Sequence, residues 1–473
     1  MINYAKHSRR LMFESEHEPD MTDFSAMTIP ELLSEQSHLC ACGRSHDTEL
    51  KYVRIESGAV RHLPEALEKL SVCRPFVVFD QNTYQAAGKK VQESLDKAGI
   101  KYSLFVFEPT PLKMEPDEYA VGSLTMGFDP ACDGIIAVGS GVVNDCCKVL
   151  AHASKLPQLV VATAPSMDGY ASNSSSMIQG HIKVSLYVPC PQAIICDTDI
   201  MKDAPLEMLM AGLGDMLAKY ISVCEWRISH LVTGEYYCEN IAGLMRASVN
   251  KCWSMAERLM KRDPEAVAAV TEGLILSGIA MSFAKISRPA SGLEHYFSHL
   301  WEMMALARGD ESHLHGIQVE VGTVITLFLM EELKKVVPNS EQARAAMAAF
   351  DLQQWEDEAR GIFGKIAPAI IDAAKTLGLN DPQRHARRLD KILVHWPDIV
   401  KIINEELPGA QETLGKMKQL HMPHSPRDLG IDLEETKKAF IGSRVIRDKY
   451  LTSTLIWDLG LTGQFKDLLK DTY

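Results

Sequence analysis

The segment that decides the fold reads DGIIAVGSGVVNDCCK and spans residues 133–148. Its first half is a short apolar run, after which Gly139 and Gly141 precede a stretch of helical pattern, DCCKVLAHASK (145–155). A buried strand that passes through a glycine turn into a helix is typical of a parallel sheet that binds a nucleotide. The glycines let backbone N–H groups approach a pyrophosphate, and the helix N-terminus adds partial positive charge. The spacing is not GxGxxG, because position 144 is Asn, so the turn alone is a weak signal.

Similar strand-like runs lie on both sides of this segment. They are RPFVVFD (74–80), KYSLFVF (101–107), LPQLVVAT (156–163) and QAIICD (192–197), and the helical pattern TYQAAGKKVQESLDKAG (83–99) separates the first two. Strands that alternate with crossover helices predict a parallel sheet with helices on both faces. We therefore expect a Rossmann-like, dinucleotide-binding α/β domain over residues 51–200, preceded by a polar lead-in over residues 1–50.

The pattern changes near residue 200. Asp203 is a candidate N-cap, with Pro205 in the first turn of a helix that continues as APLEMLMAGLGDMLAKYISVCEWRISHLV. From there to Tyr473 the chain is almost wholly helical in pattern. Helix breaks are expected at Asp263–Pro264, Arg288–Pro289, Pro338–Asn339 and Pro408–Gly409. Residues 201–473 are thus predicted to form an all-α domain, and a cleft between the two domains is the default ligand site.

Composition excludes several classes of protein. The net charge of −13 argues against general nucleic-acid binding, which needs clustered cations. No apolar run long enough for a membrane span and no signal peptide are evident, so a cytoplasmic location is expected. The eleven cysteines do not form a secreted disulfide framework. The motif HLCACGRSH (38–46) carries metal-binding residue types, but it lacks the usual C-x-x-C spacing, so reduced thiols are the expectation there.

Three segments carry residues that suit a divalent metal. Asp215 lies on an apolar helix, where an unpaired carboxylate is costly. His295 and His299 are four residues apart and share one helical face, and His313 and His315 follow in SHLHG. One carboxylate and two imidazoles leave coordination positions open, as a catalytic Lewis-acid site requires. Spacing alone does not decide which histidine binds the metal and which contacts a substrate.

Taken together, these segments resemble a known family. GSGVVNDCCK, TAPSMDGYAS, CDTDIMKDAP, AGLGDMLAKY, RPASGLEHYFSHLWEM and LHG occur in this order. In their order and in the separations between them, these motifs look like those of the glycerol-1-phosphate dehydrogenases, which belong to the dehydroquinate synthase-like and iron-containing alcohol dehydrogenase superfamily. The resemblance extends to the C-terminal IRDKYLTSTLIWDLGLTGQF, and it is the combination of motifs that is specific.

The resemblance implies a role for particular residues. The implied metal ligands are Asp215, His295 and His315, and the implied substrate contacts are Asp168, Asp215 and His299. The implied dinucleotide-binding residues are Asp80, Gly139, Gly141, Val142, Thr163, Ser166 and Ser172. Asp80 would lie near the adenosine ribose, which favours NADH over NADPH. His313 has no role in this scheme, and Asn144 stands where relatives commonly carry Ile.

The implied activity is the reduction of dihydroxyacetone phosphate to sn-glycerol 1-phosphate. It would use NAD(H) or NADP(H) and one divalent metal, zinc or nickel, with iron in more distant branches, in a homo-oligomer such as a dimer. Lys148, Lys219 and Arg288 are candidate partners of the substrate phosphate, since they lie beside the motifs.

Two alternatives remain open. A glycerol or polyol dehydrogenase could use the same metal site on an uncharged substrate, and a non-catalytic dinucleotide-binding regulatory protein could use the same scaffold. Dehydroquinate synthase fits less well, because its metal-binding carboxylate is usually Glu and Asp215 stands here.

Overall fold

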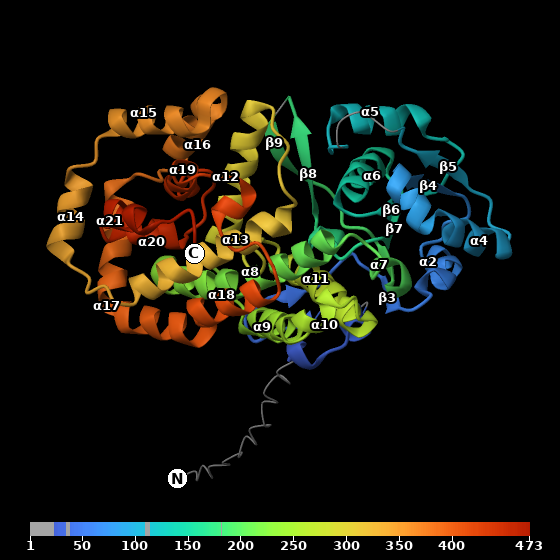
Figure 1. The fold of residues 1–473 in the computed structure, drawn as a ribbon, viewed down its shortest axis with the longest axis horizontal. Helices are drawn as coiled ribbons and strands as arrows, with labels where there is room; N and C mark the ends of the chain where they lie inside the picture. Colours follow the sequence, from blue (N-terminus) through green and yellow to red (C-terminus); the bar gives the residue numbers. More distant parts are fainter. Residues whose placement is uncertain (1–22, 35–37, 109–113, 181) are drawn as a thin grey trace, which may run out of the picture.

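A parallel sheet with helices on both faces lies beside a larger helical part (Figure 1). This architecture is seen in a computed structural model that describes residues 23–34, 38–108, 114–180 and 182–473. The six strands run in the order β3-β10-β7-β6-β4-β5, and all five neighbouring pairs are parallel. Their bounds are β3 (Tyr52–Glu56), β4 (Pro75–Phe79), β5 (Ser103–Val106), β6 (Gly134–Gly139), β7 (Gln158–Ala162) and β10 (Ala193–Asp197). The five predicted strands are confirmed, and β3 is an edge strand that the sequence pattern did not reveal.

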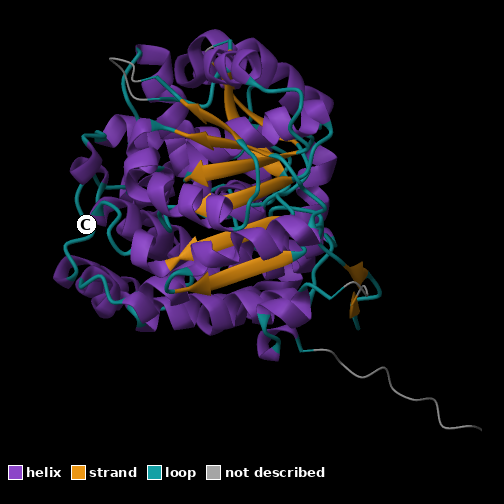
Figure 2. Cartoon of the chain, turned by 90° about the vertical axis from the view of Figure 1, so that its right-hand side faces the viewer, coloured by secondary structure: helices purple, strands orange, loops and turns teal. Residues whose placement is uncertain are grey.

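The inner strands are largely apolar because both faces of the sheet are covered, and their only polar residues are Gln158 and Asp197 at strand ends. Every residue of β4, β6, β7 and β10 is buried. Phe76 and Val78 pack on the side of α5 (Glu118–Gly127) and α6 (Gly141–Ser154). Val77 and Phe79 point to the opposite side, toward α2 (Leu63–Lys69) and α4 (Lys89–Lys97). Figure 2 shows the strands as one layer between these helices.

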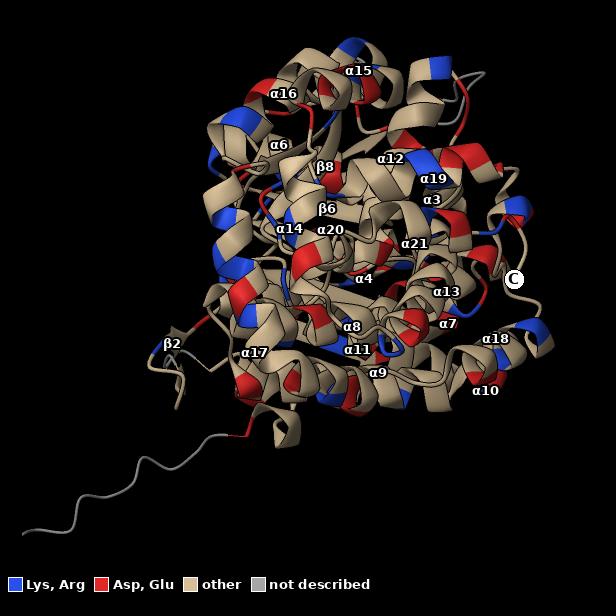
Figure 3. Cartoon of the chain, turned by 90° about the vertical axis from the view of Figure 1, so that its left-hand side faces the viewer, with Lys and Arg blue, Asp and Glu red and all other residues tan. Residues whose placement is uncertain are grey.

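The helical part begins after a short helix, α7 (Thr198–Met201). Its long helices are α8 (Leu206–Thr233), α9 (Glu239–Ser254), α11 (Pro264–Ala284), α12 (Leu293–Arg308), α13 (His315–Leu333) and α17 (Pro382–Glu406). The shorter ones are α10 (Ala256–Met260), α14 (Ser340–Ala348), α15 (Leu352–Phe363), α16 (Ala367–Thr376), α18 (Ala410–Gln419), α19 (Leu433–Ser443), α20 (Thr452–Asp458) and α21 (Thr462–Leu468). The ribbon in Figure 3 shows acidic and basic residues interspersed along these helices.

The predicted start of α8 was wrong by a few residues. Pro205, rather than Asp203, occupies the N-cap position of α8. Asp203 lies in the turn after α7, where its backbone N–H donates to Ile200 and its carboxylate pairs with Lys202 at 2.9 Å. Asp197 is the residue that caps α7. The extra short helix explains why the cap signal was assigned too early in this stretch.

Helix α11 is apolar and long enough, by composition, to cross a membrane. However, 78% of its most hydropathic window is buried inside the protein. It packs against α8 and α9. We therefore assign α11 as the core helix of the helical part.

The described part of the predicted lead-in is packed. Phe24 and Leu32 are buried, with exposed fractions of 0% and 1%. They belong to a 3-10 turn (Phe24–Ala26) and to α1 (Ile29–Leu32), which precede a small hairpin of β1 (His38–Leu39) and β2 (Ser45–His46). Phe24, Ile29, Leu32 and Leu50 thus belong to the core, while residues 1–22 and 35–37 lie outside the described residues.

A second hairpin connects the two parts of the molecule. Strands β8 (Ser174–Gln179) and β9 (Ile182–Tyr187) pair antiparallel, apart from the main sheet. Strand β8 contacts α6 and β9 contacts α12, so the hairpin lies between the α/β part and the helical part (Figure 1).

Candidate active site

A cleft of about 2240 Å³ lies between the carboxyl ends of the sheet strands and helices α12 and α13. Open parallel sheets bind ligands at this edge. The lining includes residues that follow three strands, the β8–β9 hairpin and two helices, namely Asp80–Thr83, Ser140–Val143, Thr163, Ser166–Gly169, Ser172, Lys183, Ser185, His295, His299, Glu302, His313–His315 and Arg447. The volume is sufficient for a dinucleotide beside a small substrate.

The two predicted glycines serve different purposes. Gly139 ends β6, and a Cβ atom there would lie 2.8 Å from the Cβ of Val143, so only glycine allows the helix to start this close to the strand. Gly141 is the first residue of α6 and lines the cleft with Val142. The start of α6, with its free backbone N–H groups, therefore faces the cleft.

Asn144 has an internal role. Its side chain accepts from Gln158 Nε2 at 3.0 Å and donates to the Gly169 carbonyl oxygen at 3.4 Å. Both Asn144 and Gln158 are buried. The amide thus connects α6, β7 and the loop after β7. Although Asn144 stands where relatives commonly carry Ile, its side chain is not part of the cleft lining.

The remaining predicted cofactor residues lie along the cleft. Thr163, Ser166 and Ser172 line it and are each 7% exposed. The hydroxyls of Ser166 and Ser140 are 2.5 Å apart, which joins the loop after β7 to the start of α6. Asp80 caps α3 (Gln81–Thr83), and its Oδ1 accepts from the Thr83 backbone N–H at 2.8 Å. Asp80 directly follows β4, so its carboxylate lines the part of the cleft at the carboxyl end of that strand.

Close backbone packing places Asp215 beside the loop after β7, which carries Asp168. A Cβ atom on Gly212 would lie 1.8 Å from the Pro165 carbonyl oxygen, and one on Gly316 would lie 1.9 Å from that of Ala211. The two glycines therefore allow α8 to touch both the loop after β7 and the start of α13. Asp215 lies one turn beyond Gly212 on α8, and this approach places it beside the loop.

Lys219 pairs with two carboxylates in the interior. Its Nζ lies 2.8 Å from Asp168 Oδ2 and 2.8 Å from Asp215 Oδ1. The backbone N–H of Asp168 donates to Asp215 Oδ2 at 2.9 Å, and Ser277 donates to Asp168 at 2.8 Å. Burial alone would raise the pKa of Asp215, but the charge of Lys219 and the contact with His295 hold it well below its usual range. The carboxylate is therefore ionised although it is fully buried.

His295 faces Asp215 from α12. Its Nε2 lies 3.5 Å from Asp215 Oδ1, and its Nδ1 lies 2.8 Å from Glu294 Oε1. Because a carboxylate accepts, Nδ1 carries a proton and Nε2 is the atom that faces Asp215. Burial would lower the pKa of His295, but the hydrogen bonds to Asp215 and Glu294 outweigh it and raise the pKa. The imidazole ring of His315 is 5.2 Å from that of His295, centroid to centroid.

A further acidic residue at the site was missed by the sequence analysis. Glu302 lies 3.7 Å from His299 Nδ1 and 3.7 Å from His315 Nδ1, and it accepts from Lys183 at 2.5 Å. His299, Glu302 and His315 therefore form a second set of possible metal donors, with their ligand atoms within 4.8 Å of one another. Glu302 follows His299 by three residues on the same face of α12, a spacing that could have revealed it.

His299 is neutral in this arrangement. Burial lowers its pKa to about 3, despite the nearby carboxylate of Glu302. Its ring stacks on that of His315, with centroids 5.7 Å apart. A neutral imidazole can donate one hydrogen bond and accept another, which suits the positioning of a hydroxyl or carbonyl group.

The three predicted phosphate partners are occupied elsewhere, so that expectation is wrong. Lys148, Lys219 and Arg288 are 1%, 0% and 2% exposed. Lys148 donates to Ser172 and to two backbone carbonyl oxygens, and Arg288 pairs with Glu235 at 2.6 Å. They lie near the motifs in sequence, but each neutralises or bridges internal groups instead of facing the cleft. His313 is exposed and lines the cleft, and its Nε2 contacts the Leu429 carbonyl oxygen at 3.2 Å.

Other cations do line the cleft. Within the described residues these are Lys90, Lys183 and Arg447. Lys183 pairs with Glu302, and Lys90 lines the same cleft as Asp80. Arg447 is exposed and donates to Ser185 Oγ at 3.3 Å, and its charge acts on the pKa of His299. No carboxylate pairs with Arg447 in the part of the chain that the structure describes.

Comparisons with known proteins agree with this geometry. Residues 54–205 match the sequence model of the family described as "Iron-containing alcohol dehydrogenase". A probable glycerol dehydrogenase from Sinorhizobium meliloti shares the fold, with a TM-score of 0.54 at 16% identity over 89% of this chain and 98% of that one. The iron-containing alcohol dehydrogenase of Thermococcus thioreducens has a TM-score of 0.53 at 16% identity, over 88% and 99%. The fold is that of the iron-containing alcohol dehydrogenases.

Closer relatives define the family. A glycerol-1-phosphate dehydrogenase [NAD(P)+] from Halalkalibacterium halodurans is 32% identical over 63% of this chain and 75% of its own length. Another, from Thermoplasma acidophilum, is 34% identical over 65% and 82%. The enzyme of that name from Bacillus licheniformis is 26% identical over 89% and 92%. The chain belongs to the glycerol-1-phosphate dehydrogenase family, which confirms the resemblance and its dehydroquinate synthase-like fold.

Proposed function

We propose that this protein reduces dihydroxyacetone phosphate to sn-glycerol 1-phosphate with NADH or NADPH and one divalent metal. The observation that carries the proposal is that His295 lies beside both Asp215 and His315 at one cleft, which starts at the glycine turn of α6. The names of the relatives support the substrate and the cofactor. We also propose that the enzyme acts in the cytoplasm as a homo-oligomer, a dimer.

Two of the proposed donor atoms have the spacing of neighbouring ligands to one divalent metal. Asp215 Oδ1 and His295 Nε2 are 3.5 Å apart, so one ion can lie within about 2.0–2.2 Å of both. Carboxylate and imidazole ligands suit zinc, nickel and iron, and the donors leave positions open for substrate. When bound, a divalent ion there would draw charge from the carbonyl group of the substrate. Asp215, His295 and His315 would hold it.

The surrounding residues position the substrate. Lys219 Nζ lies 2.8 Å from a carboxylate oxygen of Asp168 and 2.8 Å from one of Asp215, so it fixes the two side chains relative to each other. Asp168 also lines the cleft. Asp168 would therefore accept a hydrogen bond from a substrate hydroxyl, while Asp215 would remain with the metal. His299 is neutral, and it would hydrogen-bond the oxygen whose protonation state changes during reduction. These contacts orient the substrate below the dinucleotide.

The dinucleotide would bind along the carboxyl edge of the sheet. The start of α6, with Gly141 and Val142, would receive the pyrophosphate, and Gly139 would act only by allowing the close turn. Thr163, Ser166 and Ser172 would contact the nicotinamide half. Asp80 would face the adenosine ribose, and its carboxylate favours NADH, because it accepts from a 2′-OH and repels a 2′-phosphate.

We further propose that Arg447 binds the phosphate of the substrate. It is the cleft cation near His299 without a carboxylate partner among the described residues. Arg447→Ala should raise KM for dihydroxyacetone phosphate about tenfold to hundredfold, because a charge-assisted hydrogen bond contributes about 1.5–3 kcal/mol. The weak reduction of dihydroxyacetone, which has no phosphate, should not change. Steady-state kinetics on both substrates measure the effect.

Lys90→Ala is the matched control, because Lys90 is a cleft cation on α4, beyond β4 and away from the histidines. It should leave the ratio of the two substrates unchanged. An equal loss on both substrates in Arg447→Ala would show that Arg447 supports the fold instead. A wild-type enzyme that prefers dihydroxyacetone or glycerol would favour the polyol dehydrogenase alternative.

A further inference from the structure

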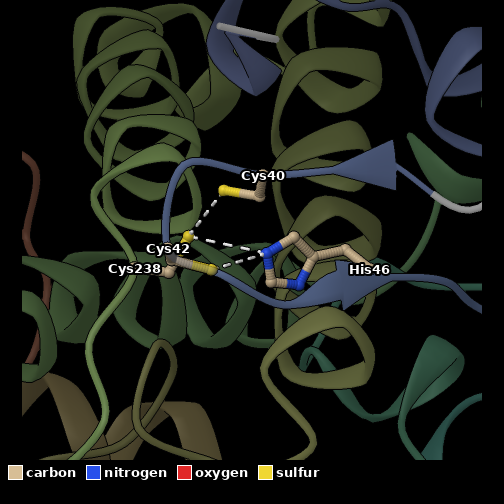
Figure 4. Close-up of side chains that lie close together, drawn as sticks. All are labelled: Cys40, Cys42, His46 and Cys238. Atoms are coloured by element: carbon tan, nitrogen blue, oxygen red, sulfur yellow. Dashed lines mark hydrogen bonds between the residues drawn. The ribbon is translucent and has the colours of Figure 1, made fainter. Parts of the chain in front are cut away.

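Four metal-binding side chains converge at a second place, away from the cleft. Cys40 and Cys42 lie in the turn of the β1–β2 hairpin, and His46 ends β2. Cys238 precedes α9 and approaches them from the helical part. Their ligand atoms all lie within 4.8 Å of one another, and the three sulfurs and the imidazole Nε2 point toward a common centre (Figure 4).

The distances are those of tetrahedral ligands around one ion. Cys40 Sγ and Cys238 Sγ are 3.6 Å apart, while His46 Nε2 lies 3.3 Å from Cys42 Sγ and 3.7 Å from Cys238 Sγ. Zinc–sulfur bonds of about 2.3 Å and a zinc–nitrogen bond of about 2.0 Å place neighbouring tetrahedral ligands about 3.5–3.8 Å apart. A disulfide would need sulfurs about 2.05 Å apart. The cluster therefore has the dimensions of a metal site and not those of a disulfide.

The groups around the cluster orient its ligands. His46 is fully buried, and its Nδ1 donates to the Phe283 carbonyl oxygen at 3.0 Å. That hydrogen bond fixes the proton on Nδ1 and turns the lone pair of Nε2 toward the sulfurs, as in histidine ligands of metal sites. Asn240 donates to Cys40 Sγ at 3.4 Å, and the Tyr236 hydroxyl lies 3.4 Å from Cys42 Sγ. Such donors stabilise thiolates.

We propose that Cys40, Cys42, His46 and Cys238 bind a structural zinc ion. Three thiolates and one imidazole are soft and borderline ligands that select zinc, and four protein ligands leave no position for a substrate. Binding displaces the thiol protons of the three cysteines to solvent. The missing C-x-x-C spacing has a simple cause, because the fourth ligand lies 192 residues after His46.

The ion would fasten the N-terminal hairpin to the helical part. The hairpin touches the end of α11 through Phe283 and the start of α9 through Cys238. Phe24 packs edge-on against both His46 and Phe283, at 5.5 and 5.2 Å between ring centroids. The zinc would thus close a long loop of the chain and add folding free energy where few backbone hydrogen bonds hold the hairpin.

The test uses the full-length protein reconstituted with Co²⁺. Wild type should show thiolate-to-cobalt charge-transfer absorption, which the oxygen and nitrogen donors of the active-site cleft cannot produce. Cys238→Ser should lose this absorption and one metal equivalent per subunit, while it retains the metal of the cleft. Cys73→Ser is the matched control, because Cys73 is exposed and outside the cluster, and it should keep both.

X-ray absorption on zinc-loaded protein gives a second measurement in case Cys238→Ser does not fold. It should be made on His295→Ala, in which the cluster is the remaining zinc site, and should show three sulfur ligands and one nitrogen ligand. Absence of sulfur in the zinc shell, absence of the cobalt charge-transfer band in wild type, or a Cys40–Cys238 disulfide in mass spectrometry of the native protein would overturn the proposal. These readouts do not depend on turnover, so they stand apart from the proposed catalytic function.

Discussion

His295→Ala is expected to purify with one metal equivalent less per subunit than wild type and without measurable turnover. His295 supplies Nε2 at 3.5 Å from Asp215 Oδ1, and its loss leaves the proposed catalytic ion with two protein ligands. His299→Ala should keep its metal and its dinucleotide affinity. It should lose about tenfold to hundredfold in kcat, because a hydrogen bond of about 1.5–3 kcal/mol to the transition state is removed.

Elemental analysis of both variants beside steady-state kinetics distinguishes two ligand sets. Asp215, His295 and His315 form the proposed set, whereas the ligand atoms of His299, Glu302 and His315 also lie close together. If His299→Ala loses the metal and His295→Ala keeps it, the ion lies at Glu302 and the proposed assignment is wrong. The two outcomes are opposite, so a single comparison decides between them.

Lys219→Met is expected to destabilise the protein strongly when no metal is bound. The substitution removes the cation that lies 2.8 Å from both Asp168 and Asp215, and it leaves the fully buried carboxylate of Asp215 and the largely buried one of Asp168 without that partner. Breaking a buried ion pair from one side costs about 3–5 kcal/mol of folding free energy. Added zinc should recover part of the loss, because an ion at Asp215 neutralises one carboxylate and binds only the folded state.

Thermal unfolding with chelator and with added metal measures this effect. Lys251→Met is the matched control, since Lys251 forms a surface pair with Glu272 in which both side chains are substantially exposed, and such pairs contribute about 0–1 kcal/mol. A midpoint for Lys219→Met equal to that of the control would show that the fold does not depend on the ion pairs of Lys219 with Asp168 and Asp215.

The main sheet was predictable because its inner strands are buried on both faces. Strands β4, β6, β7 and β10 therefore appear as continuous apolar runs. The edge strand β3 alternates polar and apolar residues, and the β8–β9 hairpin is rich in serine, so neither had such a signal. The apolar pattern thus identified the buried strands, but it did not identify the strands that carry polar residues.

The site was predictable to the extent that its chemistry depends on residue type. Asp215, His295 and His315 drew attention as candidate metal-binding residues in apolar or paired positions, and the fold places His295 beside each of the other two. Arg447 did not, because it lies more than one hundred residues further along the chain and reaches the cleft only through the tertiary fold. Lys148 and Arg288 were chosen as candidate phosphate partners because they lie near the motifs in sequence. In the structure they bind internal partners instead.

The same limit applies to the cysteine cluster. Within residues 38–46 the spacing gives no zinc signature, and Cys238 has no sequence feature that links it to His46. Only the packing of the hairpin on α9 and α11 places the four ligands around one centre. Metal sites assembled from distant segments escape motif analysis for this reason.

The most direct test of the account is a cofactor-oxidation assay with dihydroxyacetone phosphate on chelator-treated protein, before and after addition of a single divalent metal. We expect no activity without metal, recovery once the cleft site is refilled with one equivalent per subunit beyond the zinc of the cysteine cluster, and a far higher kcat/KM for dihydroxyacetone phosphate than for dihydroxyacetone. Full activity in the metal-free protein, or equal kcat/KM for the two ketones, would contradict it.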